Sequence, residues 1–109
     1  MLDVRLYLAQ RLSAMVMAPL VLGHLAVMIY AVQGGLSAAE ILSRTQGSIW
    51  WGMFYGLFVV AVSVHAAIGL RVVAHEYLKV SGAGLNVFSW LVCLGLLAIG
   101  GRAVAAVVL

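Results

Sequence analysis

Residues 50–74 read "WWGMFYGLFVVAVSVHAAIGLRVVA", an apolar run whose one formally charged residue, Arg71, lies close to its end. A helix of about 20 such residues crosses the roughly 30 Å hydrocarbon core of a bilayer, so this run predicts a transmembrane helix. Two similar runs, at residues 11–33 and 85–109, predict one further span on each side of it. None of the three shows the apolar/polar alternation of a membrane β-strand. The chain is therefore predicted to be an all-α integral membrane protein with three transmembrane helices.

The composition agrees with this class and gives no sign of a separate soluble domain. The chain has 109 residues, 66% of them hydrophobic and 8% charged, and its mean hydropathy is +1.20. The net charge is +3, but the six basic residues are scattered between apolar runs and form no patch for nucleic acid. No leader with a basic start and a short apolar core is recognisable, and Cys93 is interpreted as a packing residue. We expect a single membrane domain over residues 1–109.

The basic residues predict the orientation, because loops rich in Lys and Arg stay in the cytoplasm. With three spans, the N-terminus and the second loop share a side, and they carry Arg5, Arg11, Arg71 and Lys79. The opposite side has Arg44 and Arg102. The N-terminus is therefore predicted to be cytoplasmic. In the first loop, "SAAE" at residues 37–40 predicts a capping box that opens a short surface helix. In the second, "SGAG" at residues 81–84 predicts a flexible turn.

Two histidines lie inside the predicted spans, His24 in the first and His65 in the second. An ionisable residue at membrane depth is costly unless it is paired or ligated, so each is a candidate functional residue. One interpretation is a hydrogen bond between helices, which histidines make in membranes. The other is ligation of a metal or haem. Neither span contains Asp or Glu, so a small proton-coupled transporter is the weakest alternative.

The depths of the two histidines differ. His24 is 13 positions from Arg11 and His65 is six positions from Arg71, two arginines that mark the same side of the membrane. At 1.5 Å per residue the imidazoles lie about 20 Å and about 9 Å from that side. Adjacent helices packed 8–10 Å apart cannot sandwich one haem between them. If both histidines are ligands, they serve two haems, and a second chain supplies the opposite ligands.

Polar residues gather where the second span leaves the membrane, on the side of Arg11 and Ser13. They are Arg71, His75, Glu76 and Tyr77. Arg71 could pair with a haem propionate, and the others could supply donors and protons to a quinone carbonyl. Arg and Tyr at a helix end are also common interface anchors, and spacing does not separate the two interpretations. His75 could be a proton donor, a propionate partner or a solvated loop residue, and the last interpretation is favoured.

The segment "HAAIGLRVVAHEYL" resembles the second-helix signature of the cytochrome b membrane anchors of succinate dehydrogenase and fumarate reductase. In that family a haem-ligating His is followed by Gly, an acid and often Tyr, at the spacings of His65, Gly69, Glu76 and Tyr77 here. The segment "RLSAMVMAPLVLGHLAV" is similar to the first helix, and its His24 lies where dihaem members have a second ligand. Gln10 and Ala14 stand where the family commonly has His and Gly, and Glu76 replaces its Asp.

The resemblance implies a membrane anchor that forms half of a haem-binding helical bundle, completed by a second anchor chain. Flavoprotein and iron–sulfur subunits, carrying FAD and iron–sulfur clusters, would dock on the cytoplasmic side of a bacterial or archaeal membrane. His65 and His24 would ligate two haems b through their iron, with Arg71 as a propionate partner. A quinone would bind near Arg11, Ser13, Glu76 and Tyr77. This chain alone would have no turnover. A haem-free assembly subunit and a single-haem anchor that uses only His65 remain the alternatives.

Overall fold

The structure is a computed structural model that describes residues 3–109, a part of the chain built from helices without strands. Its helices are α1 (Val4–Gly34), α2 (Ala38–Thr45), α3 (Ile49–Leu78) and α4 (Gly82–Val108). The three long helices are each apolar and long enough to cross a membrane, which confirms the predicted all-α integral membrane class. All three extend beyond the predicted spans at the same end of the molecule, where α1 and α4 begin and α3 ends.

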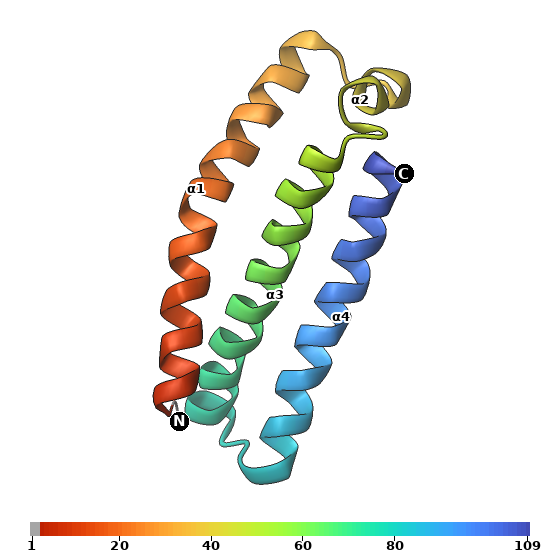
Figure 1. The fold of residues 1–109 in the computed structure, drawn as a ribbon. Coiled ribbons are helices and arrows are strands. Elements are labelled where there is room, and N and C mark those ends of the chain that lie inside the picture. The colour runs from red at the N-terminus through yellow and green to blue at the C-terminus, as the bar shows by residue number, and fades with distance from the viewer. Residues whose placement is uncertain (1–2) are drawn as a thin grey trace.

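The long helices form a layer with α3 in the middle (Figure 1). Among the residues that the structure describes, five of the eight buried ones belong to α3, as expected for the helix with a neighbour on each side. Most of these are small, and glycines allow further close approaches. A Cβ on Gly100 of α4 would lie 2.5 Å from Val59 Cγ1, and one on Gly23 of α1 would lie 3.1 Å from Phe54 Cζ. Small residues let membrane helices approach each other, and here they hold α1 and α4 against α3.

The predicted capping box in the first loop is confirmed. The backbone N–H of Glu40 donates to Ser37 Oγ, and the backbone N–H of Ser37 donates to the Glu40 carboxylate. The Ser37 hydroxyl also donates to the Glu40 carboxylate. The bond from the Ser37 backbone N–H has the larger effect and the bond from the hydroxyl a smaller one, and together they lower the pKa of Glu40 below its usual value. The box starts α2 immediately after the left-handed backbone of Gly35, whose φ is 119°.

The end of α2 and the turn after it close the last turn of α4 (Figure 1). Thr45 Oγ1 donates to the Val107 carbonyl at 2.6 Å, and the Gly47 N–H donates to the Val108 carbonyl at 2.7 Å. The last carbonyls of a helix have no partner within it, so these bonds satisfy groups that would otherwise be unpaired. The short surface helix therefore ties the first loop to the far end of the chain.

The turn between α3 and α4 is shorter than predicted. α3 ends at Leu78, and the next residue, Lys79, caps it with a left-handed backbone, whose φ is 60°, and an N–H that donates to the Ala74 carbonyl. α4 then begins at Gly82, so most of the segment 81–84 is helical rather than a flexible turn. The prediction was wrong because it treated each glycine as a turn residue. Only Gly82, with φ 62°, uses that freedom, and Gly84 continues the helix.

Candidate functional site

His65 on α3 faces Ser13 on α1, with its Nδ1 atom 3.3 Å from Ser13 Oγ. The serine is buried, with 8% of its surface exposed, and His65 is half-buried. The contact connects two helices through polar groups within an apolar layer. Ser13 and His65 therefore lie on the faces of α1 and α3 that are turned toward each other.

The hydrogen bonds of Ser13 favour one tautomer of His65. Ser13 Oγ lies 2.9 Å from the Gln10 carbonyl, which can only accept. A hydroxyl has one proton, so a Ser13 that donates to Gln10 receives the proton of His65 Nδ1–H at its free lone pair. In the neutral imidazole the lone pair is then on Nε2, the state in which a histidine binds a metal. Ser13 thus holds the ring while it leaves Nε2 free to act as a ligand.

His24 on α1 has a different environment, made of aromatic rings on α3. Its ring centroid lies 5.4 Å from that of Phe58 and 6.1 Å from that of Tyr55, both in edge geometries. Within residues 3–109 these rings, rather than a hydrogen-bonding side chain, are its neighbours. A cavity of about 730 Å³ opens beside it, with mostly apolar walls that include Trp51 and Ala31. The site has room for a large planar group next to the imidazole.

The two histidines lie at separate levels of the layer. His24 contacts Phe58, which precedes His65 by seven residues on α3. At 1.5 Å per residue this separation is about 10 Å along the helix axis. The two imidazoles could therefore serve two groups stacked along the layer, and they are not placed to bind one group from opposite sides.

Gly69 lies one turn beyond His65 and faces the side chain of Gln10. A Cβ at this glycine would be 3.6 Å from Gln10 Nε2, an ordinary contact distance. Gln10 also has a buried Oε1 atom without a hydrogen-bond partner in the described part of the chain. The Gln10 side chain of α1 therefore packs beside Gly69, at a position where a Cβ would also fit.

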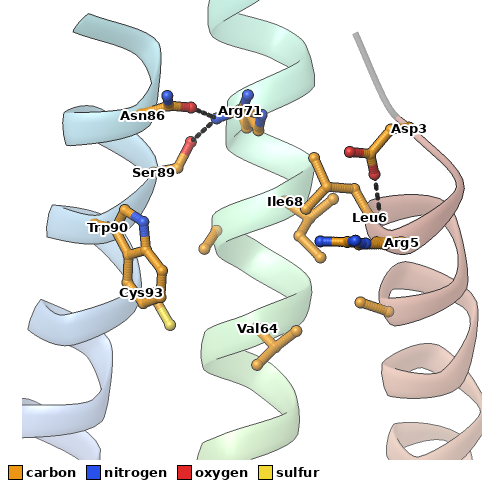
Figure 2. A pocket seen from close by; sticks show the side chains of 12 residues that line it. Asp3, Arg5, Leu6, Val64, Ile68, Arg71, Asn86, Ser89, Trp90 and Cys93 are labelled. Atoms are coloured by element: carbon orange, nitrogen blue, oxygen red, sulfur yellow. Dashed lines mark hydrogen bonds between the residues drawn. The ribbon is translucent and has the colours of Figure 1, made fainter. Parts of the chain in front are cut away.

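Arg71 points to α4 and not toward His65. Its Nη1 donates to Asn86 Oδ1 at 2.9 Å and to Ser89 Oγ at 3.2 Å (Figure 2). Arg71 therefore bonds to α4, whereas Ser13 and His65 meet across the α1–α3 contact. The role of Arg71 as a propionate partner stays a prediction. The sequence placed Arg71 at the right end of the helix, but it lies six positions after His65, a separation that turns it by about 120° to another face of α3.

The other predicted site residues lie at the end where α1 begins and α3 ends. Arg11 is exposed, and its guanidinium lies 5.9 Å from the centroid of the Tyr7 ring. Glu76 and Tyr77, in the last turn of α3, are exposed as well. His75 is turned inward, with Nδ1 3.1 Å from the Val80 carbonyl, so it belongs to the helix end and is not a free loop residue.

The sequence analysis missed the polar residues of the third span. Asn86 and Ser89 bind Arg71, and their spacing of three places them on one face of α4. Two polar residues at helical spacing within an apolar span were a signal that could have been used. Thr45, which bonds the end of α4, carried no comparable signal, because its position depends on how α2 folds back.

The three long apolar helices, with one histidine at each of two levels between the first two, define a helical integral membrane protein. The family model described as the succinate dehydrogenase/fumarate reductase transmembrane subunit matches residues 1–101. The chain belongs to that family and is a membrane anchor subunit, which confirms the resemblance seen in its motifs. No curated protein and no solved structure matches the chain.

Proposed function

We propose that this chain binds haem b in a succinate:quinone oxidoreductase, with His65 and His24 as axial ligands to two separate haems. The contact between Ser13 and His65 carries the proposal, because it orients a histidine between two membrane helices and leaves its Nε2 free. A second anchor chain would supply the opposite ligands. Bound haem supplies one-electron chemistry, and the protein adjusts its potential through the ligands, their hydrogen bonds and burial.

The residues around His24 fit a haem by their chemistry. The imidazole opens on an apolar cavity, and its neighbours Tyr55 and Phe58 present aromatic surface. Arg44 lines the same cavity and is engaged with the Gly35 carbonyl and the Tyr30 ring. An apolar pocket with one nitrogen donor suits a macrocycle held at its iron.

The quinone would bind at the end of the layer that holds Arg11, Glu76 and Tyr77. Their exposed side chains offer a cation, an acid and a phenol, the groups that hold and protonate a quinone carbonyl. Ser13 stays a candidate for the quinone site, but its buried position against His65 also supports a role as the hydrogen-bond partner of His65. The flavoprotein and iron–sulfur subunits would dock on this end, which the basic residues predict to be cytoplasmic. Electrons would then enter near His65 first.

The contact between Ser13 and His65 also supports a second candidate function. A haem-free structural anchor would use the same bond to hold α1 against α3, a contribution of about 0.6 kcal/mol in a membrane. A single-haem anchor that uses only His65 lies between the two. All three predict the same fold and differ in the number of haems.

Haem content tests these alternatives. The complex is purified through a tag on this chain, and its dithionite-reduced minus oxidised spectrum is recorded with pyridine haemochrome quantification. Two haems b per complex are expected. One haem per complex would support the single-haem anchor that uses only His65. A complex without a Soret band would support the haem-free structural anchor.

Replacing Ser13 with alanine is expected to raise the midpoint potential of the haem at His65. The Nδ1–H bond to Ser13 increases the basicity of the ligand and so stabilises ferric iron, and the variant loses this effect. Loss of such an orienting partner also weakens metal binding by about tenfold or more. A redox titration followed at the haem absorption bands measures the shift, and Ser13→Thr should restore the original potential.

The matched control is Ser63→Ala, on the same helix as His65. The Ser63 hydroxyl is buried too, but it donates to the Val59 carbonyl of its own helix. This variant should leave the potential unchanged. If Ser13→Ala and Ser63→Ala shift the potential equally, Ser13 acts through packing and not on the tautomer of His65.

A further inference from the structure

A second pocket lies over α3 near the end where α1 begins, on the face of the layer opposite to the cavities beside His24. It has a volume of about 480 Å³, and α1 and α4 flank its floor (Figure 2). Its floor includes Val64, Ile68 and Arg71. At 100° per residue these positions point about half a turn away from Tyr55 and Val59, which line a cavity at His24. The pocket is therefore separate from the proposed haem sites.

At the polar end of this pocket, the two arginines form no ion pair with a carboxylate of residues 3–109. Arg71 donates to the neutral groups of Asn86 and Ser89, and its Nε atom is buried without a partner in the described part of the chain. Arg5 adds a second guanidinium group to the lining. Asp3 lies there as well, but its carboxylate accepts from the Leu6 backbone N–H as the cap of α1. A cation in an apolar layer is stabilised by an anion that reaches it.

The position of the pocket along the helices indicates what kind of anion this is. Arg71 lies seven residues before the end of α3, which is about 10 Å inside that end. For a spanning helix this depth is close to the boundary between headgroups and hydrocarbon. Away from this boundary the walls become apolar, with Val64, Trp90 and Cys93 (Figure 2). A ligand that fits has a negative head at the level of the arginines and an apolar tail.

We propose that this pocket binds an anionic phospholipid, with its phosphate between Arg5 and Arg71 and an acyl chain along Val64, Trp90 and Cys93. Guanidinium groups match phosphate oxygens through paired hydrogen bonds. Asn86 and Ser89 hold the Arg71 guanidinium at the pocket wall, and Arg5 lines the same pocket. A lipid can reach this side of the layer directly from the membrane. The site does not depend on whether the chain binds haem.

Native mass spectrometry of the purified complex tests the proposal. Phosphatidylglycerol and phosphatidylcholine are titrated separately into the detergent-solubilised complex, and the bound lipid is counted. Phosphatidylglycerol should be retained selectively, and Arg71→Gln and Arg5→Gln should each weaken its binding about fivefold, as expected for one arginine near a membrane surface. Arg71→Lys, which keeps the charge, should weaken phosphatidylglycerol binding less than Arg71→Gln does.

The matched control is Arg102→Gln, an exposed arginine of α4 near the opposite end of the layer, which removes the same charge. It should leave phosphatidylglycerol binding unchanged. Equal losses in all three glutamine variants would mean unspecific attraction to surface charge and would overturn the proposal. Equal retention of the two lipids, or displacement of the lipid by inorganic phosphate, would also overturn the proposal. If neither Arg71→Gln nor Arg5→Gln changes lipid binding, the proposal is wrong as well, and a partner side chain would be the expected occupant of the pocket. Arg5 is exposed at the start of α1, so its variant still tests the site if Arg71→Gln does not fold.

Discussion

Changing His65 to alanine is expected to remove one of two haems b from the complex. The variant deletes the nitrogen that Ser13 orients, and no other histidine of the described chain lies at that level of the layer. Without His65 the iron would have only the ligand of the second anchor chain, so we expect the haem to be lost during purification. Haem quantification on the purified complex measures the result, and the reduced minus oxidised spectrum should keep the bands of the haem at His24. Electron transfer to quinone should slow as well, because this haem is expected to lie nearer the cytoplasmic side.

His75→Ala is the matched control for this variant. It removes a histidine of the same helix whose Nδ1 lies 3.1 Å from the Val80 carbonyl at the helix end. Its haem content should equal that of the wild type. A His65→Ala complex that assembles and keeps two haems would show that His65 serves packing alone.

Changing His24 to alanine is expected to remove the other haem and leave the haem at His65 in place. The two imidazoles lie about 10 Å apart along α3, so each site should respond separately. The cavity beside His24 would lose its nitrogen donor but keep its aromatic walls. The measurement is again haem per complex, together with the midpoint potentials that remain.

Leu25→Ala is the control for His24, because it changes an exposed side chain at the same depth of α1. It should retain both haems. If His24→Ala also retains both, the chain is an anchor with at most one ligand of its own, and His24 packs against Phe58 and Tyr55. If both histidine variants lose all haem, the two sites are not independent.

Several features of the fold could be predicted from local sequence. Each span follows from an apolar run, and the capping box of α2 follows from Ser37 and Glu40, whose reciprocal bonds need only three residues of spacing. The separate depths of His24 and His65 follow from helical rise alone. The long helices extend beyond the predicted spans, because a helix can continue past the hydrocarbon as long as its backbone hydrogen bonds continue. One example is α1, which begins at Val4, although the predicted span begins at residue 11.

The partners of the polar residues could not be predicted in the same way. Depth in the membrane grouped Arg71 with Ser13 and Arg11, but the direction around α3 turns Arg71 to Asn86 and Ser89. The three long helices are apolar on all faces, and lipid is as apolar as a protein interior. Hydropathy therefore carries no signal for which face meets which helix.

The sequence by itself determined the three apolar spans, the separate levels of the two histidines and the family to which the chain belongs, because these depend on local composition and spacing. The tertiary structure alone decided that Ser13 faces His65 and that His24 lies among aromatic rings. It also decided that Arg71 points toward α4 and not toward either histidine. These contacts depend on how closely the helices approach through residues such as Gly23 and Gly100. Close packing of small residues sets the rotation of each helix in lipid, and it becomes visible only when all three helices are in place.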